Sequence, residues 1–494
     1  MYHSSGAIAS ASRELSPDSD LIELFEGLLT GSFPWLLDSA LPVGGFGRHS
    51  FAGADPYALV RATGSAIEVE VRRAVRPGMP LGISRFEGDP LEMLRALCPS
   101  APVRADADVP FVGGAVGYLG YELAAQIEEL DFRSKDDLAL PDLYFLLVDR
   151  LVAFDPVSNR LAVHALGFAD DPGEAGARAD AAADEFRARL ETPQASPAPA
   201  PAPAPAERMQ RPPFAFFDRA SYADAVDFAK QEIAAGNAYQ ICLTHRVERD
   251  LAADSWSLYR RLRKLNPAPF ASYFDLGEVA IVSSSPERFL RLAPDRVAES
   301  RPIKGTRPRG ADASADRATR NELANSAKDR AENLMIVDLV RNDLGRVCEV
   351  GSVAVPDLMA IEDYAAVFQM VSTVRGRLRE DRDRIDLIRA AFPPGSMTGA
   401  PKLAAMRIIE RLEPVRRGIY SGAIGYLDVR GGLDLSVVIR TVLVKAGRAY
   451  VHAGGGIVAD SDPTAEWTET LDKSRPLDEA ITAAEQSTPP TPSA

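Results

Sequence analysis

Apolar and polar residues alternate along short stretches in the first part of the chain, which predicts β-strands. Residues 66–71, Ala-Ile-Glu-Val-Glu-Val, alternate without a break, as a strand with one buried face does. Residues 143–155 and 161–166 are apolar on both sides of a Pro-Val-Ser-Asn turn and predict a hairpin. A helix is expected at residues 21–29, followed by an apolar strand at 33–39. This part of the chain is therefore predicted to be rich in β-structure.

The second half of the chain combines strands with longer helical patterns. Apolar segments at residues 269–275, 278–285 and 289–292 lead through a turn to Val297, which predicts an antiparallel meander. Residues 320–344 carry apolar positions at the helical period and predict one long helix. We therefore expect a mixed α/β protein.

A proline-rich stretch divides the chain. Proline and alanine alternate at residues 197–205, a composition that favours extended polyproline II and prevents a packed core. The polar ends of the chain are expected to be disordered. The predicted organisation is a tail at 1–20, an N-terminal β-rich region at 21–191, a linker loop at 192–213, a catalytic region at 214–485 and a tail at 486–494.

Charge and cysteine usage narrow the class of protein. A net charge of −14 and a pI near 5.1 argue against a nucleic acid or a membrane as partner, because both demand a basic face. No apolar run is long enough to cross a bilayer, and no signal peptide is recognisable at the start. Cys98, Cys242 and Cys348 lack paired spacing, which is typical of the reducing cytosol. We therefore expect a cytoplasmic protein.

One lysine has an unusual setting in the stretch Ser-Arg-Pro-Ile-Lys-Gly-Thr, residues 300–306. The preceding strand is expected to end at Pro302, and Gly305 lets the backbone turn. Lys304 would then project at the mouth of a sheet and be available for chemistry. The alternative interpretation is a surface lysine that follows a proline.

A carboxylate is predicted to point at the core. Glu332 lies on the same helical stripe as Met335, Ile336 and Leu339. An unpaired charge there would cost on the order of several kcal/mol, so the group needs a cation or a strong pKa shift. A salt bridge with a buried arginine is the alternative.

A second group of carboxylates follows a predicted helix start. Asp462 before Pro463 is typical of an N-cap and first turn, and Glu466, Glu469 and Lys473 then share one helix face. Together with the first carboxylate they form the oxygen-rich, histidine-free set that Mg²⁺ prefers. A solvated stripe is the alternative.

Four motifs stand out in the second half: residues 302–306 (Pro-Ile-Lys-Gly-Thr), 338–344 (Asp-Leu-Val-Arg-Asn-Asp-Leu), 394–402 (Pro-Gly-Ser-Met-Thr-Gly-Ala-Pro-Lys) and 453–458 (Ala-Gly-Gly-Gly-Ile-Val). In these motifs and their order, over residues 221–480, the chain resembles the chorismate-utilising enzymes, specifically the large subunit of aminodeoxychorismate synthase and its relative anthranilate synthase component I. The resemblance implies an α/β fold of two packed subdomains, with antiparallel β-sheets inside and helices outside.

The resemblance also implies Mg²⁺ as cofactor and chorismate as substrate. Glu332 and Glu469 would be the metal ligands, supported by Glu466, and the metal would hold a carboxylate of chorismate. The glycines would form a turn whose amide N–H groups converge on an anion, and one arginine would project from a strand at residues 435–444. The substrate-binding positions are Arg440, Tyr420, Thr398, Gly454, Gly455, Gly456 and Lys473.

In the enzymes that this chain resembles, a lysine at the position of Lys304 is thought to add to C2 of chorismate, after which ammonia enters at C4. Only the free amine can attack, so positive charge nearby is expected to help, with Mg²⁺, Arg301 and Arg307 as candidates. Glu287 would act as general acid or base. Anthranilate synthases have a small residue instead of Lys304, and ammonia attacks C2 directly. The lysine therefore favours 4-amino-4-deoxychorismate, a precursor of p-aminobenzoate and folate, as product.

A partner subunit and an inhibitor site are also expected, and two residues differ from those of many relatives. A separate glutamine amidotransferase subunit is expected to supply ammonia, because no such domain is recognisable in the chain. Residues 36–39 resemble the element that holds tryptophan as inhibitor in anthranilate synthases, with an edge strand and turn as the alternative. Gln369 stands where many relatives have histidine, and Cys242 where some have asparagine. The competing functions are anthranilate synthase component I and a catalytically silent regulatory homologue.

Overall fold

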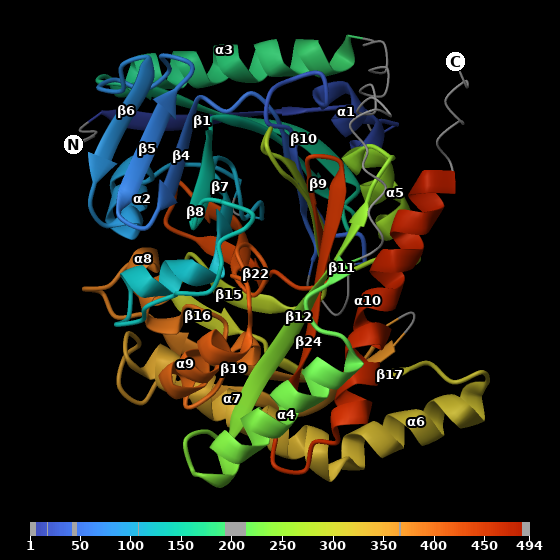
Figure 1. Ribbon diagram of the computed structural model, residues 1–494. Coiled ribbons are helices and arrows are strands. Elements are labelled where there is room, and N and C mark those ends of the chain that lie inside the picture. Colours follow the sequence, from blue (N-terminus) through green and yellow to red (C-terminus); the bar gives the residue numbers. More distant parts are fainter. Residues whose placement is uncertain are drawn as a thin grey trace.

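The computed structural model describes residues 6–16, 18–41, 47–106, 108–192, 214–364 and 367–486. Its strands form two large sheets of 12 strands each, with helices around them (Figure 1). Neighbouring strands within both sheets are antiparallel. None of the described helices is long and apolar enough to span a bilayer.

The first sheet contains β1 (Ala7–Glu14), β2 (Trp35–Asp38), β3 (Ser50–Gly53), β9 (Arg150–Asp155), β10 (Arg160–Ala169), β11 (Phe214–Ala215), β12 (Gln240–Asp250), β13 (Phe270–Asp275), β14 (Ala280–Ser285), β20 (Gly399–Ala400), β23 (Thr441–Lys445) and β24 (Arg448–Ile457). Its order is β1-β10-β9-β3-β2-β13-β14-β23-β24-β12-β11, with β20 beside β12.

The second sheet contains β4 (Ala58–Thr63), β5 (Ala66–Val71), β6 (Gly82–Glu87), β7 (Gly114–Leu119), β8 (Leu143–Val148), β15 (Arg288–Leu292), β16 (Val297–Ser300), β17 (Ile303–Pro308), β18 (Ala354–Asp363), β19 (Val367–Arg377), β21 (Ala423–Asp428) and β22 (Leu433–Val437). Its order is β17-β19-β16-β15-β22-β21-β7-β8-β4-β5-β6, with β18 beside β19.

The helices are α1 (Leu21–Leu28), α2 (Pro90–Leu97), α3 (Pro172–Glu191), α4 (Arg219–Ala234), α5 (Ser255–Leu265), α6 (Ala313–Asn325), α7 (Ala327–Gly345), α8 (Arg384–Ala391), α9 (Lys402–Leu412) and α10 (Pro463–Gln486), with 3₁₀ turns η1 (Tyr121–Gln126) and η3 (Gly395–Met397). Buried side chains of α1, α3, α5 and α10 pack against the first sheet, and those of α2, α7 and α8 against the second.

Both sheets are built from strands on both sides of residues 192–213. In the first sheet β2 pairs with β13, with Asp38 opposite Ala271. In the second, β7 pairs with β21, with Leu119 opposite Ala423. The two halves of the sequence therefore share their sheets and form one body, and the expected α/β fold with antiparallel sheets inside and helices outside is confirmed.

A core of large apolar side chains fills the space between the sheets. Phe51 of the first sheet makes an edge-to-face contact with Tyr426 of the second, with ring centroids 5.6 Å apart. Phe111 stacks on Tyr426 at 4.5 Å, and Trp35 in the same cluster is fully buried. Aromatic pairs of this kind contribute beyond their buried area, so this cluster holds the two sheets together.

Most local predictions are confirmed, but one is wrong. The helix at 21–29, the strand at 66–71 and the hairpin around 156–159 are present as α1, β5 and the β9–β10 pair. The disordered tail predicted at 1–20 is wrong for residues 7–14, because β1 pairs along its whole length with β10. Backbone hydrogen bonds hold β1 at the sheet edge. The polar side chains of this segment do not indicate such pairing in the sequence. The linker from 193 to 213 and the tail from 487 lie outside the described residues.

Two further predictions are corrected in detail. The expected meander is divided between the sheets, since β13 pairs with β14 in the first and β15 with β16 in the second. The predicted single helix is two helices, α6 and α7, separated at Ser326. The hydroxyl of Ser326 accepts a hydrogen bond from the backbone N–H of Asp329 at 3.3 Å, which caps α7 and stabilises the break.

Candidate active site

The candidate site forms where the chain crosses from one sheet to the other. Glu287 lies in the crossing from β14 to β15, and Arg440 in the crossing from β22 to β23. The predicted strand at 435–444 is therefore interrupted, and Arg440 adopts a positive φ of 52°. Two backbone hydrogen bonds join these crossings. The Val437 N–H donates to the Glu287 carbonyl at 2.9 Å, and the Ser284 N–H donates to the Arg440 carbonyl at 3.0 Å.

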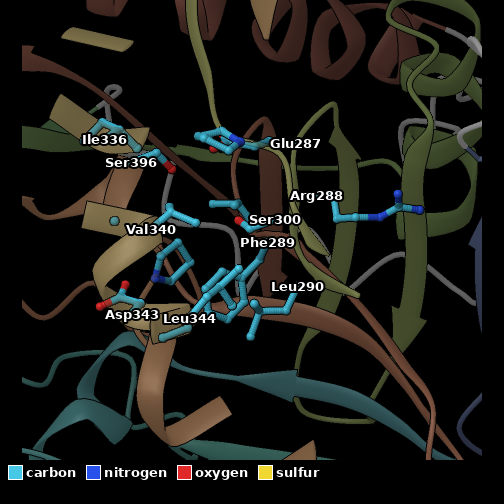
Figure 2. Close-up of a pocket in the computed structure, with 15 residues that line it drawn as sticks. Glu287, Arg288, Phe289, Leu290, Ser300, Ile336, Val340, Asp343, Leu344 and Ser396 are labelled. Atoms are coloured by element: carbon cyan, nitrogen blue, oxygen red, sulfur yellow. The ribbon is translucent and has the colours of Figure 1, made fainter. Parts of the chain in front are cut away.

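Glu287 is a buried carboxyl at the end of a narrow cleft. It is 5% exposed, and in Figure 2 it lies with Ser396 at one end, while Asp343 and Leu344 line the other. Burial raises the pKa of Glu287 to about 7, against the opposing effects of the Ser396 hydroxyl and the Lys304 ammonium. A carboxyl that titrates near neutrality can both donate and accept a proton.

Lys304 lies near three carboxylates. The preceding strand β16 ends before Pro302 as predicted, but Lys304 itself belongs to the further strand β17, where it is half-buried. Burial acts to raise the pKa of Glu287, Glu332 and Glu469, and the positive charge of Lys304 acts in the opposite direction on all three. Among the described residues Lys304 has no ion-pair partner, so its side chain is available to a bound molecule.

The two neighbouring arginines are committed elsewhere. The guanidinium of Arg301 forms an ion pair with Glu362, and that of Arg307 pairs with Glu322 and Asp329, each at 2.8 Å. Their charges are thus matched by carboxylates, which weakens both as the expected source of positive charge beside Lys304.

Glu332 lies at the margin of the buried face of α7 and not in its centre. The centre is formed by Asn333, Ile336 and Val340. The Glu332 carboxylate accepts a hydrogen bond from the Gln240 amide at 3.4 Å. Burial raises its pKa, and the like charge of Glu469 adds to the effect. Of the two outcomes that the sequence left open for Glu332, a cation or a shifted pKa, the structure shows a raised pKa together with the Lys328 ammonium 3.9 Å away.

The helix that carries the other two carboxylates begins where the sequence predicts. The Asp462 side chain accepts a hydrogen bond from the Ala465 N–H at 2.8 Å and caps α10. Glu469 pairs with Lys473 at 2.7 Å. Burial alone would raise the pKa of Glu469, but the neighbouring lysines outweigh it and lower the pKa.

Glu466 is 2% exposed, and its two oxygens differ. Oε1 accepts a hydrogen bond from the Ser461 hydroxyl at 2.6 Å and lies 3.3 Å from Lys328 Nζ. Oε2 is buried and has no hydrogen-bond partner among the residues that the structure describes. An orphaned buried carboxylate oxygen is costly and points to a missing ligand.

The three glycines form part of a strand, and the predicted turn is wrong. Gly454, Gly455 and Gly456 belong to β24 and lie opposite Thr244, Leu243 and Cys242 of β12. The reason for glycine is close approach: a Cβ on Gly455 would lie 3.0 Å from Glu466 Oε2 and 3.6 Å from Glu469 Oε1. A Cβ on Gly456 would lie 2.0 Å from the Gln240 amide nitrogen. These positions are therefore kept open for the side chains of the carboxylate cluster.

The glycine amides still face the candidate site. The Thr244 N–H donates to Glu413 at 2.8 Å, so it does not bond to the facing Gly454. By the alternation of antiparallel pairing, the N–H groups of Gly454 and Gly456 then point away from β12. Lys473 confirms this direction, because its ammonium donates to the Gly454 carbonyl at 2.7 Å.

The remaining predicted substrate positions converge on the same region. Arg440 donates to the Lys473 carbonyl at 2.5 Å, and burial lowers its pKa. Tyr420 is buried, stacks on His452 with centroids 4.7 Å apart, and has a pKa raised by burial. Thr398 is fully buried, and its carbonyl accepts a hydrogen bond from Cys242 at 2.9 Å. The structure therefore brings all twelve predicted site residues into one region.

Three residues near the site were not predicted. Ser396 lies within the motif at 394–402 and acts on Glu287, and Lys328 lies one helical turn before Glu332. Gln240 joins Glu332 to the glycine strand. The helical spacing of Lys328 was visible in the sequence, whereas the position of Gln240 depends on the pairing of β12 with β24.

Gln369 and Cys242, which differ from the residues expected in many relatives, lie on strands beside the candidate site. Gln369 lies opposite Thr306 in the pairing of β17 with β19, beside the strand of Lys304. Its Oε1 is buried without a hydrogen-bond partner among the described residues. Cys242 is buried, and burial raises the pKa of its thiol, so it stays protonated.

The tryptophan site at residues 36–39 stays a prediction. Asp38 in this segment is buried and accepts hydrogen bonds from Tyr259 at 2.9 Å and from Arg263.

The carboxylate cluster offers a metal ion only a small number of protein ligands. Among the described residues, no group of three histidine, cysteine, aspartate or glutamate side chains could hold an ion by itself. Mg²⁺, however, commonly uses only one or two carboxylates and completes its octahedron with water and substrate. Gln240 Oε1 and Glu466 Oε2 are buried acceptors without a described donor. The donor set therefore fits Mg²⁺ with few protein ligands.

Solved structures share this fold. Anthranilate synthase component I from Streptococcus pneumoniae matches with a TM-score of 0.73 and 29% identity, over 87% of this chain and 92% of that one. The menaquinone-specific isochorismate synthase MenF from Escherichia coli matches with a TM-score of 0.66, over 96% of this chain and 95% of its own, but at 18% identity it shows the fold alone. The fold class is that of anthranilate synthase component I.

The sequence match is more specific than the fold. The profile of the chorismate binding enzymes covers residues 49–479, and the chain belongs to this family of enzymes.

Individual relatives carry two different names. The aminodeoxychorismate synthase of Streptomyces griseus is 44% identical over 91% of this chain, which spans only 61% of that relative. Aminodeoxychorismate synthase component 1 of Salmonella typhimurium is 40% identical, covering 89% of this chain and 91% of its own. Anthranilate synthase component 1 of Pseudomonas aeruginosa is 38% identical, covering 92% and 91%. Overall identity therefore does not separate the two activities.

Proposed function

We propose that this protein catalyses the Mg²⁺-dependent amination of chorismate at C4 to 4-amino-4-deoxychorismate, with ammonia supplied by a separate glutamine amidotransferase subunit. The observation that carries the proposal is the position of Lys304, a half-buried side chain without an ion-pair partner among the described residues, close to Glu287 and to the carboxylates Glu332 and Glu469. Mg²⁺ at the two carboxylates would offset their negative charge and so favour the free amine. Two of the relatives above are named aminodeoxychorismate synthase, and their similarity to this chain supports the same activity.

The proposed reaction has two displacement steps. The Lys304 amine forms a bond to C2 of chorismate, the ring double bond shifts, and the C4 hydroxyl leaves as water with a proton from Glu287. Ammonia then forms a bond to C4, the double bond shifts back, and the bond from C2 to Lys304 breaks. Glu287 takes up the proton that ammonia releases. A pKa of about 7 lets Glu287 serve in both directions.

Binding would divide between a cation site and an anion site. Mg²⁺ would be held by Glu332 and Glu469, with Glu466 in support, and would supply positive charge for a carboxylate of chorismate. Arg440 and Lys473 carry the positive charge for the remaining carboxylate. The amides of Gly454 and Gly456 and the Tyr420 side chain would orient the ring. Thr398, whose hydroxyl donates to the Gly395 carbonyl at 3.2 Å, would support the same region.

Product analysis tests the function. With chorismate, Mg²⁺ and an ammonium salt, chromatography and mass spectrometry should identify 4-amino-4-deoxychorismate. With glutamine in place of ammonium, turnover should require an added amidotransferase subunit of the matching family. Fluorescent anthranilate as product would favour the anthranilate synthase alternative, and no consumption of chorismate would favour a regulatory homologue. Activity with ammonia, but none with glutamine and any amidotransferase subunit of the matching family, would contradict the partner proposal.

Removal of either proposed metal ligand should abolish turnover. Glu332→Ala or Glu469→Ala is expected to reduce activity below about one per cent of wild type, because the lost charge would hold Mg²⁺. Tm should change little, since neither side chain lies in an apolar core. Glu479→Ala, an exposed glutamate on the same helix as Glu469, is the matched control. Near-normal activity of either variant at limiting Mg²⁺ would contradict the metal assignment.

A further inference from the structure

Lys328 lies between two of the three carboxylates proposed for Mg²⁺. Its ammonium is 3.3 Å from Glu466 Oε1 and 3.9 Å from Glu332 Oε1. A cation of the chain itself, the Lys328 ammonium, therefore already contacts these carboxylates.

This arrangement has little value as a stabilising ion pair. The Lys328 side chain is 52% exposed, and water screens the pairs of an exposed ammonium, so they contribute little to stability. Lysine one turn before glutamate is also the weaker orientation on a helix. Yet Lys328 makes the only ion pair of Glu466 and of Glu332 among the described residues. Lys328 is thus better explained as a counter-charge for the two carboxylates than as a residue that stabilises its helix.

The second oxygen of Glu466 shows that one lysine does not satisfy the cluster. Oε2 is buried without a described partner, and Gln240 Oε1 beside Glu332 is in the same condition. A single ammonium supplies one charge and three donors, whereas a divalent ion binds several oxygens at once. The long, flexible and half-exposed lysine side chain can move into solvent when such an ion enters.

We propose that Lys328 is a resident counter-ion of the metal site, which neutralises Glu332 and Glu466 in the metal-free protein and must be displaced when a divalent cation binds. Lys328 thereby weakens metal binding until the substrate carboxylate adds its own ligand. This inference rests on the metal site of the proposed function and assigns Lys328 as a determinant of metal affinity, not as a catalytic residue.

The test is direct metal binding to the full chain without chorismate. Isothermal titration calorimetry with Mg²⁺, and Mn²⁺ titration followed by electron paramagnetic resonance, should show roughly tenfold tighter binding to Lys328→Gln than to wild type, because a positive charge within 4 Å of the ligands is removed. Lys328→Arg keeps the charge and should bind no more tightly than wild type.

Lys264→Gln is the matched control, since Lys264 is an exposed lysine of α5 that makes no ion pair in the described part of the chain. It removes the same charge and should leave metal affinity unchanged. Unchanged or weaker binding to Lys328→Gln, equal tightening in the control, or no metal binding in any of the proteins would overturn the inference. The product assay with ammonium reports separately on the proposed reaction, so tighter binding with anthranilate as product would retain the inference and reject the function.

Discussion

Replacing Lys304 by alanine should remove most formation of 4-amino-4-deoxychorismate. The amine is the proposed nucleophile at C2, and without it ammonia has no activated C4 to attack. The expected loss is at least about hundredfold in rate, or about 2.7 kcal/mol of transition-state stabilisation. Glu287 and the carboxylate cluster remain, so ammonia can reach C2 directly. Residual product should therefore shift toward the C2-aminated compound or anthranilate.

Lys304→Arg should not restore the activity. A guanidinium stays protonated at any pH used for an enzyme and cannot attack carbon. Chromatography and mass spectrometry of the products of wild type and both variants give the answer, with Lys264→Ala as the control for loss of a lysine elsewhere. If Lys304→Ala retains full C4 amination, or if wild type itself produces anthranilate, Lys304 is not the nucleophile.

Replacing Glu287 by glutamine should reduce turnover by roughly 10²- to 10⁴-fold, the usual contribution of a general acid or base. Glutamine preserves shape and hydrogen bonding but transfers no proton. Departure of the hydroxyl needs the protonated carboxyl, whose pKa is about 7. Single-turnover loss of the hydroxyl should therefore slow as pH rises through about 7 in wild type, and Glu287→Gln should lose this dependence.

The same substitution should stabilise the protein at high pH. The pKa of Glu287 is raised from 4.5 to about 7 by burial, so the folded state binds more protons than the unfolded state between these values. Stability then falls as pH rises through this window, by up to about 3 kcal/mol. Glutamine avoids that loss. The Tm of Glu287→Gln should exceed that of wild type above about pH 7 and approach it near 4.5.

Two results would exclude this role of Glu287. One is a variant with wild-type turnover, since the proton donor would then be another group. The other is a difference in Tm that does not change with pH, because it would show that the pKa of the carboxyl is the same in the folded and the unfolded protein. Glu122, another buried carboxyl with its pKa raised by burial to about 8, remains in both proteins and does not affect the comparison.

Short sequence patterns were sufficient to predict several features of the candidate site. The N-cap at Asp462 and the shared face of Glu466, Glu469 and Lys473 follow from the helical period and from capping chemistry, which act within a few residues. The strand end before Lys304 depends likewise on a neighbouring proline. These features needed no knowledge of the rest of the chain, and the structure places them as the sequence predicts.

Pairing between distant strands decided the rest. The sequence alone determined the α/β class, the start of α10 and the motif residues, because these depend on local periodicity and turn chemistry. It did not show that the predicted meander crosses between sheets at Glu287, or that Gly455 lies in a strand against Glu466. Nor did it place Lys328 against Glu466, 138 residues away in the chain. Only the tertiary structure decides such contacts, because sheet order and helix docking are set by burial over the whole chain, and no short pattern contains that information.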